Sequence, residues 1–240
     1  MLEIKSISKY FGGIKALDNC SFKIEKGKIN ALIGPNGSGK STLFNVISNL
    51  ISNKSGNILL DKTNLSHKKD FEIAKEISRT FQDVRLFKNL SIKEHLKIAL
   101  MENDEKLRNL FRKEKNYSHE IKSILKLVGL DKSPNTIVSN LSYGQKKLLD
   151  LAIAIAKPHK ILMLDEPVAG VNPALRKQIK NILKELNKKG RTILLVEHDM
   201  NFVMDVADRI YVMNYGKIIA EGTPKQIQNN KKVLEAYLGS

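Results

Sequence analysis

The sequence predicts an α/β fold: a mostly parallel sheet with an antiparallel β part at its N-terminal end and an inserted α-helical lobe. Near-continuous apolar segments at residues 28–33, 160–164 and 192–196 are typical of parallel strands that are buried on both faces. A helical pattern separates the last two segments, which is the strand–helix–strand order of an α/β sheet. A polar, helical pattern from about residue 91 to residue 130 interrupts this order and predicts the lobe.

Both ends of the chain predict antiparallel strands. Residues Leu2–Phe11 and 21–24 have the pattern of short edge strands. Residues 209–213 and 217–220 flank Asn214-Tyr215-Gly216, which predicts a hairpin turn. We therefore expect antiparallel strands to accompany the parallel ones at both ends of the sequence.

The helix between the last two parallel strands has clear boundaries. Pro173 fits its first turn, and Lys188 and Lys189 fall in its last turn, where cations favour the helix dipole. Gly190 is the residue type expected just beyond a helix end. The buried face is predicted to be an apolar stripe of Ile179, Ile182, Leu183 and Leu186.

The inserted lobe is most charged at residues 102–120. Gly129 and Pro134, residue types that terminate helices, mark the end of its helical pattern. The chain of 240 residues has the size of one large domain. We predict a single domain in which residues 1–82 and 151–240 form the core and residues 83–150 form the helical lobe. The packing residues expected in the charged stretch are Leu107, Leu110 and Phe111.

The composition indicates a soluble protein with a sizeable core. Hydrophobic residues make up 42 % of the chain, charged residues make up 28 %, and the mean hydropathy is -0.27. The N-terminus has no apolar signal core, and no apolar run approaches the roughly 20 residues needed to cross a bilayer. Cys20 is the only cysteine, so no disulfide can form within the chain and a reducing compartment is expected. Cys20 itself is predicted to be a small buried hydrophobic residue.

The formal net charge of +16 raises the question of nucleic acid as a partner. The basic residues are scattered in pairs, aromatic residues are only 6 % of the chain, and tryptophan is absent. No basic stripe is interleaved with stacking residues, so no nucleic-acid partner is expected. The simplest interpretation of the charge is a solvated surface, and attraction to phosphate ligands and to an anionic cytoplasmic leaflet is an additional one.

Residues 34–42 match the phosphate-binding pattern G-x-x-x-x-G-K-[ST]. They follow an apolar strand and precede a helical run of Leu43, Phe44, Val46, Ile47 and Leu50. Glycines let backbone N–H groups turn toward phosphates, Lys40 is expected to reach the β- and γ-phosphates, and the Ser41 hydroxyl is expected to ligate Mg²⁺. The predicted nucleotide-binding residues of this loop are Gly34, Pro35, Asn36, Gly37, Ser38, Gly39, Lys40, Ser41 and Thr42.

Two other strands are followed by polar residues. Asp165 ends one apolar strand and is expected to hold Mg²⁺, and Glu166 is placed to polarise the attacking water. His198 follows the last apolar strand, where open α/β sheets bind ligands, and is expected to contact the γ-phosphate. The other histidines show no metal spacing and are predicted to be surface residues: His67, His95, His119 and His159.

The pentapeptide Leu141-Ser142-Tyr143-Gly144-Gln145 resembles the signature of the ATP-binding cassette (ABC) ATPases, and the order of motifs resembles that family across nearly the whole chain. The resemblance implies a P-loop NTPase (RecA-like) fold that binds ATP and Mg²⁺ and hydrolyses ATP. It implies that Ser142 and Gly144, with Gln145 beside them, bind the nucleotide of an opposing protomer. Further roles implied by the resemblance are adenine stacking by Phe11 (with Tyr10 as the alternative), sensing of Mg²⁺ and the γ-phosphate by Gln82, a catalytic base at Glu166, and a switch at His198.

Finer stretches are similar to the ATPases of branched-chain amino-acid importers. They lie at residues 10–13, 79–87, 197–200, 221–224 and 235–239. Two residues depart from the commonest family pattern: Tyr143 stands where many members have Gly, and Asn172 ends a loop that often ends in Asp. The charged stretch 102–120 is short for this branch.

The resemblance implies several partners. These are two multi-span membrane permease subunits, a second ABC ATPase that is identical or homologous, and indirectly a periplasmic or extracellular binding protein. The chain is expected to be cytoplasmic and peripheral on the inner face of the cell membrane, with residues 83–90 as the permease contact. The alternatives are another cargo, such as urea or amide uptake or lipid or polysaccharide export, and a soluble ABC ATPase acting on DNA or the ribosome, which the net charge alone supports.

Overall fold

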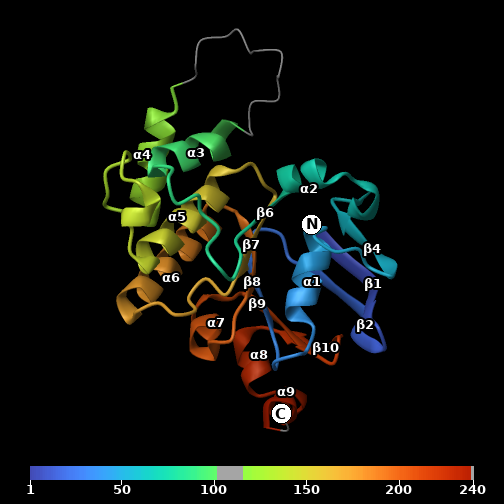
Figure 1. Ribbon diagram of the computed structural model, residues 1–240. Coiled ribbons are helices and arrows are strands. Elements are labelled where there is room, and N and C mark those ends of the chain that lie inside the picture. The colour runs from blue at the N-terminus through green and yellow to red at the C-terminus, as the bar shows by residue number, and fades with distance from the viewer. Residues whose placement is uncertain (102–115, 239–240) are drawn as a thin grey trace.

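A computed structural model of the protein describes residues 1–101 and 116–238. Figure 1 shows a central sheet with the helices of the inserted lobe on one side and a second, antiparallel sheet, accompanied by further helices, on the other. Most of the charged stretch predicted at 102–120 lies outside the described residues. The same is true of its expected packing residues Leu107, Leu110 and Phe111.

The central sheet has six strands in the order β10-β9-β3-β8-β7-β6. All neighbouring pairs are parallel except β9 and β10, which form the predicted C-terminal hairpin. The three predicted parallel strands are therefore confirmed, and two more strands have parallel partners. β9 was predicted only as part of the antiparallel hairpin but also pairs in parallel with β3, and β6 was not predicted because it has only three residues. The strands are β3 (Ile29–Ile33), β6 (Ile77–Arg79), β7 (Ile161–Asp165), β8 (Thr192–Val196), β9 (Arg209–Asn214) and β10 (Lys217–Gly222).

The continuous apolar pattern of the parallel strands arises because both faces of the sheet are covered. In β8, Ile193 and Leu195 face one hydrophobic core with the helical lobe, whereas Leu194 and Val196 face a second core with helix α1 (Lys40–Ile47) and the antiparallel sheet. Successive side chains of a strand point to opposite faces, so each strand serves both cores.

The antiparallel sheet has the order β2-β1-β4-β5, with strands β1 (Leu2–Phe11), β2 (Ile14–Ile24), β4 (Ser55–Leu60) and β5 (Thr63–Asn64). Two predictions were wrong here. β1 is an interior strand between β2 and β4, and β2 begins at Ile14 rather than at residue 21. The first residues of β2 pair with the end of β1, but Ile14 is 72 % exposed, so they lack the apolar alternation of a buried strand.

The helix predicted from residue 173 is α6 (Pro173–Lys188). The Asn172 side chain caps it by accepting a hydrogen bond from the Leu175 amide at 2.8 Å, and Gly190 follows it with a φ of 78°. α1 (Lys40–Ile47) ends before Leu50, which is 55 % exposed and was wrongly included in the helical run. The remaining core helices are α2 (Asp70–Glu76), α7 (Met200–Val206), α8 (Pro224–Gln228) and α9 (Lys231–Leu238).

The inserted lobe contains α3 (Ile92–Met101), α4 (Ser118–Val128) and α5 (Tyr143–Ala156). Figure 1 shows these helices together at one side of the central sheet. α4 ends at Gly129 in the left-handed conformation, as its position in the sequence suggested. α5 runs without a break through residue 150, and the division of the chain at 82/83 and 150/151 remains a prediction.

Within residues 1–101 and 116–238, no helix is long and apolar enough to cross a membrane.

Candidate active site

The order of the central sheet brings three predicted motifs to one edge. β3, β8 and β7 are consecutive parallel neighbours, so their carboxyl ends meet at the same edge. The segments that leave those ends begin with Gly34, Glu197 and Glu166. Ligands of open α/β sheets bind at such an edge.

The phosphate loop is held tightly against two hairpins. A Cβ atom on Gly34 would lie 2.1 Å from the backbone oxygen of Met213, and one on Gly39 would lie 2.4 Å from that of Ala16. Gly39 has a φ of 106° and starts α1, whose first turn is capped by no side chain of the described residues. Its N–H groups and the positive end of the helix dipole are therefore available to an anion.

Lys40 is buried within this loop, with an exposed fraction of 5 %. Its Nζ donates hydrogen bonds to the carbonyl oxygens of Gly34 and Pro35, both at 2.8 Å. Burial lowers the pKa of the ammonium, and the charge of Glu166 acts in the opposite direction. The predicted phosphate lysine is thus electrostatically linked to the predicted catalytic base.

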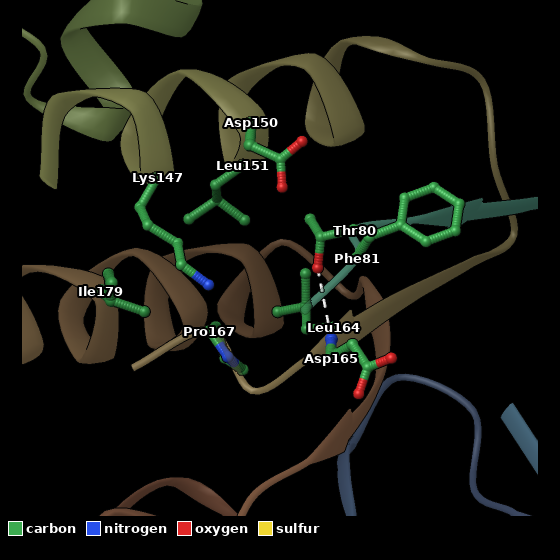
Figure 2. A pocket seen from close by; sticks show the side chains of 9 residues that line it. All are labelled: Thr80, Phe81, Lys147, Asp150, Leu151, Leu164, Asp165, Pro167 and Ile179. Carbon is green, nitrogen blue, oxygen red and sulfur yellow. Dashed lines mark hydrogen bonds between the residues drawn. The ribbon is translucent and has the colours of Figure 1, made fainter. Parts of the chain in front are cut away.

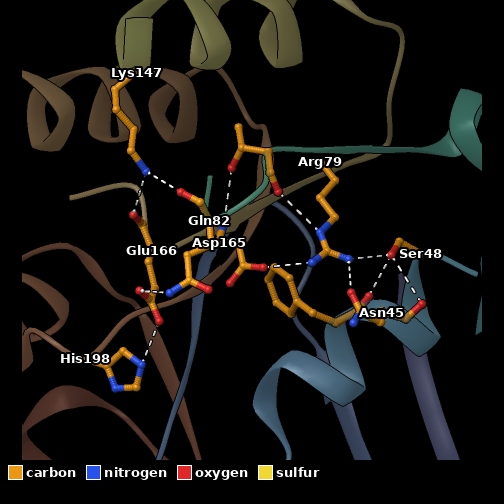
Figure 3. A network of polar contacts seen from close by, with 10 residues as sticks. Asn45, Ser48, Arg79, Gln82, Lys147, Asp165, Glu166 and His198 are labelled. Carbon is orange, nitrogen blue, oxygen red and sulfur yellow. Dashed lines mark hydrogen bonds and ion pairs between the residues drawn. The ribbon is translucent and has the colours of Figure 1, made fainter. Parts of the chain in front are cut away.

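Asp165 forms a buried ion pair that the sequence did not reveal. The Arg79 Nη2 lies 2.8 Å from Asp165 Oδ2, and Arg79 Nη1 donates to Asn45 at 2.8 Å and to Ser48 at 2.9 Å on α1 (Figure 3). The Thr80 hydroxyl accepts a hydrogen bond from the Asp165 amide at 3.2 Å. Burial lowers the pKa of the Arg79 guanidinium, while Asp165 opposes that change. Arg79 thereby connects β6 to the end of β7 and to the C-terminal end of α1.

Glu166 brings three predicted catalytic residues into contact (Figure 3). Its Oε1 lies 2.8 Å from His198 Nε2, and its Oε2 accepts a hydrogen bond from Gln82 Nε2 at 3.0 Å. The residue has a left-handed φ of 48°, and its amide donates to the Val196 carbonyl at 3.0 Å. Such a conformation is uncommon for residues other than glycine and persists where neighbouring contacts fix it.

Glu197 holds the loops after β7 and β8 together, and sequence reasoning assigned it no role. It is 3 % exposed, and its two carboxylate oxygens accept from the amides of Val168 at 2.9 Å and His198 at 3.2 Å. Burial raises the pKa of its carboxyl despite these hydrogen bonds. The signal was its place directly after a largely apolar strand, since a carboxylate that such a strand buries has to be hydrogen-bonded.

The signature residues begin helix α5, whose first turn is capped by side chains, unlike that of α1. The Ser142 hydroxyl accepts from the Gln145 amide at 3.3 Å, and the Gln145 Oε1 accepts from the Ser142 amide at 3.0 Å, which is a capping box. Ser142 is exposed. Gly144 packs so closely on Leu175 that a Cβ atom would lie 2.7 Å from its Cδ2. The structure therefore gathers Lys40 and the Glu166 cluster at the sheet edge, while Ser142 remains an accessible helix cap.

The two candidates for adenine stacking lie at the end of β1. The Phe11 ring is 49 % exposed, with Lys9 Nζ 5.2 Å from its centroid. The Tyr10 ring is approached by Lys15 at 5.8 Å and by Lys54 at 4.7 Å. Both rings remain predictions for this role.

Two histidines predicted to be surface residues are not. His95 is 5 % exposed, and its Nε2 accepts from the Phe87 amide at 3.0 Å while its Nδ1 lies 2.9 Å from the Ser91 carbonyl. His159 is half-buried, and burial lowers its pKa. Both rings can be buried because backbone groups form hydrogen bonds with their nitrogens, and the sequence does not show these contacts. His119 is exposed as predicted, and the part of the chain that the structure describes contains no cluster of three or more His, Cys, Asp or Glu suited to a metal.

Cys20 fits its prediction as a small buried hydrophobe. Its side chain is 1 % exposed in the core between the two sheets. Burial raises the pKa of the thiol to about 12, so it is unreactive at neutral pH.

The C-terminal helix α9 lies against the phosphate loop. A hollow of about 200 Å³ is lined by the tip of the loop, by Tyr215, and by Glu235 and Ala236 of α9. The Tyr237 hydroxyl accepts a hydrogen bond from the Gly34 amide, and burial raises the pKa of that hydroxyl to about 12. The sequence identified this stretch only as a family feature, because nothing local indicates contact with a loop two hundred residues away.

The parallel sheet, the glycine-rich loop that begins α1 and the acidic residues at the adjacent strand end define a P-loop nucleotide-binding protein. Residues 17–169 match the ABC transporter family, and the chain belongs to that family. Residues 217–240 match a second family, described as the branched-chain amino acid ATP-binding cassette transporter.

Curated relatives match the chain along its whole length. The high-affinity branched-chain amino acid transport ATP-binding protein LivG of Escherichia coli (strain K12) is 38 % identical over 249 residues, which cover 100 % of this chain and 98 % of LivG. The probable branched-chain amino acid transport ATP-binding protein LivG of Archaeoglobus fulgidus is also 38 % identical, over 100 % of this chain and 96 % of its own.

Solved structures share the fold. A nucleotide-free ATP-binding cassette from an ABC transporter superimposes with a TM-score of 0.87 at 35 % identity, covering 100 % of this chain and 99 % of that one. The ADP conformation of the cassette MJ1267 gives a TM-score of 0.85 at 35 % identity, with the same coverage. A dimeric post-hydrolysis state of the cassette MJ0796, bound to ADP and Pi, gives 0.80 at 27 % identity over 93 % of this chain and 99 % of that one.

Proposed function

We propose that this chain is the ATP-hydrolysing subunit of an importer that takes up branched-chain or related hydrophobic amino acids through separate membrane subunits. The contact of Glu166 with Gln82 and His198, at the same sheet edge as the phosphate loop, carries the proposal of ATP hydrolysis. The match of residues 217–240 and the names of the full-length relatives support the cargo.

The nucleotide is proposed to bind along the phosphate loop. Backbone N–H groups within residues 36–42, which include the start of α1, supply donors for the phosphates, and Lys40 exchanges its loop carbonyls for β- and γ-phosphate oxygens. Phe11, or alternatively Tyr10, supplies an exposed ring for the adenine.

The residues present fit Mg²⁺, which prefers oxygen ligands. Ser41 offers a hydroxyl, Gln82 an amide oxygen and Asp165 a carboxylate. The Gln82 Nε2 is engaged by Glu166 and the Asp165 Oδ2 by Arg79, so Gln82 Oε1 and Asp165 Oδ1 are free of these contacts. When bound, the ion would neutralise negative charge on the phosphates.

Glu166 is the proposed general base. Its carboxylate would accept a proton from the attacking water, and His198 and Gln82, each bonded to one of its oxygens, would hold it in place for that step. Glu197 fixes the two loops that carry Glu166 and His198.

Each complete site is proposed to need two chains. Ser142 and Gly144, with Gln145 beside them, would bind the γ-phosphate held by a second ABC ATPase, identical or homologous. The exposure of Ser142 and the dimeric state of MJ0796 with ADP and Pi support this arrangement. Closure on ATP would draw the helical lobes (residues 83–150) toward each other on cores formed by residues 1–82 and 151–240.

The membrane partners are proposed to be two multi-span permease subunits, fed by a periplasmic or extracellular binding protein. The chain would then sit in the cytoplasm on the inner face of the membrane. The proposed permease contact is the segment 83–90, where Phe87 is 69 % exposed and its amide is anchored by His95.

The test of the reaction is Glu166→Gln. We expect ATP hydrolysis to fall by about 100-fold to 10,000-fold, the range for loss of a general base, with ATP affinity changed by less than about threefold. Glu185→Gln, an exposed glutamate on α6, is the matched control. Near-normal hydrolysis by Glu166→Gln would rule out the assigned base.

The test of the partners is purification from native membranes in mild detergent. Two related multi-span subunits and a second cassette ATPase are expected to co-purify. The assembly reconstituted in vesicles together with the binding protein is expected to transport leucine when ATP is supplied on the side of the cassettes. Recovery with ribosomes and without membrane subunits would overturn the importer proposal.

A further inference from the structure

Lys147 is a buried lysine on the helix that begins with the signature residues. It lies on α5, five positions after Ser142, and is only 6 % exposed. Figure 2 shows its side chain extending from α5 toward Pro167, in the loop after β7. A buried ammonium group is costly unless hydrogen-bond acceptors surround it, so its partners require explanation.

The acceptors of Lys147 are backbone oxygens of two site residues. Its Nζ donates to the Gln82 carbonyl at 3.0 Å and lies 3.5 Å from the Glu166 carbonyl (Figure 3). The same Nζ lies 5.9 Å from the centroid of the Tyr143 ring, in the signature itself. Lys147 thus connects the start of α5 to the two segments that carry the proposed base and its amide partner.

These two segments need to be held at a fixed separation. The Gln82 and Glu166 side chains bond to each other at 3.0 Å, and Glu166 has a left-handed φ of 48°. A single ammonium between their backbones fixes both, because a charged donor binds carbonyl oxygens more strongly than a neutral one.

Asp150 accompanies Lys147 one turn further along α5. Both side chains line a cavity of about 10 Å³ between α5 and the ends of β6 and β7 (Figure 2). Burial raises the pKa of the Asp150 carboxyl to about 7, and the charge of Lys147 opposes that rise. The remaining lining residues are Thr80, Phe81, Leu151, Leu164, Asp165, Pro167 and Ile179.

We propose that Lys147 is a positioning residue that couples the signature helix to the catalytic segments of its own chain. The inference rests on the proposed function, in which Ser142 contacts the nucleotide of the partner chain. When α5 shifts on engaging that nucleotide, Lys147 transmits the shift to the backbones of Gln82 and Glu166. Binding at one composite site thereby adjusts the base at the other.

The first test compares three lysine variants of the purified protein. Lys147→Met is expected to lower kcat for ATP hydrolysis about tenfold or more, the rate equivalent of losing one hydrogen bond from a charged donor. The Kd for ATP is expected to stay within about twofold, because Lys147 contacts no phosphate-loop residue. Lys147→Arg is expected to restore most of kcat, and Lys122→Met, an exposed lysine on α4, is the control. A kcat for Lys147→Met equal to that of the natural protein would overturn the inference and leave the proposed function standing.

The second test is independent of turnover. Hydrogen–deuterium exchange in Lys147→Met is expected to accelerate in the segments 80–86 and 166–169, and to stay unchanged in α4. Unchanged exchange in both segments would overturn the inference, whether or not the natural protein hydrolyses ATP. Absence of ATP hydrolysis by the natural protein would by itself refute only the proposed function. If Lys147→Met does not fold, Lys147→Gln, which keeps a neutral donor, takes its place in both measurements.

Discussion

Helices α1 and α5 both begin at glycine-containing motifs, yet their N-termini are built in opposite ways. α1 starts at Gly39 in a left-handed conformation, next to the buried Lys40, and its first turn is capped by no described side chain. α5 starts at the exposed Ser142, where Ser142 and Gln145 cap each other. In the proposed function, the first is a phosphate site that one chain supplies whole and the second is half of a site shared by two chains. The lysine of the second helix, Lys147, points inward to the backbone oxygens of Gln82 and Glu166.

Removing the charge of Lys40 at the start of α1 should have the largest effect on ATP binding. We expect Lys40→Met to weaken ATP binding by a single chain about 100-fold, because it deletes a charged donor to the phosphates. Titration with a fluorescent ATP analogue measures this directly. An affinity within about threefold of the natural protein would place the phosphates elsewhere.

Adding a negative charge at Ser142, at the start of α5, should lower ATP hydrolysis without changing ATP binding by the single chain. Ser142→Asp keeps a good N-cap but sets a carboxylate against the partner's phosphates. We expect unchanged ATP affinity of the single chain, an unchanged Tm, and hydrolysis lowered about 30-fold or more by charge repulsion. Ser142→Ala is the control for capping and is expected to cost about 1 kcal/mol of stability. A loss of single-chain affinity in Ser142→Asp would contradict the division between the two helix starts.

The buried body of α5 offers a pH-dependent test. The pKa of the Asp150 carboxyl is raised from 3.8 to about 7 in the folded protein. Between these two pH values the folded protein keeps a proton on Asp150 that the unfolded chain has released. The free energy of unfolding therefore falls as pH rises through this window and levels off above it.

Asp150→Asn removes this penalty while keeping the shape of the side chain. We expect a stability gain on the order of 2 kcal/mol at about pH 8, allowing for partial exposure, and none at about pH 4. Thermal melts at both values measure it. An equal gain at both would show that Asp150 titrates normally.

The smallest effect is expected at the cap of α6. Asn172 accepts from the Leu175 amide, and an aspartate accepts equally well. Asn172→Asp is expected to change the free energy of unfolding by at most a few tenths of a kcal/mol. A change above about 1 kcal/mol in denaturant titration would show that the amide nitrogen has a partner of its own.

The sequence predicted those parts of the molecule whose causes are local. The parallel strands and α6 were predictable because apolar runs and helix signals lie within a few residues, as at Pro173 and Gly190. The start of β2 was missed because Ile14 faces solvent, and β6 because it has three residues.

The same limit applies to the site. Lys40, Asp165 and Glu166 stand in contiguous motifs, and His198 was predicted from its place after an apolar strand. Gln82 was found only through the resemblance. The Arg79 ion pair and the contacts of Lys147 and Tyr237 join segments far apart in sequence, so no spacing rule indicates them.

The two-chain site is tested most directly by the mass of Glu166→Gln in solution with ATP, with and without Ser142→Asp. The account predicts a dimer for Glu166→Gln with ATP and a monomer with ADP, and a monomer that still holds ATP for the double variant. A double variant that dimerises with ATP as readily as Glu166→Gln would contradict the claim that the start of α5 acts on the nucleotide of another chain.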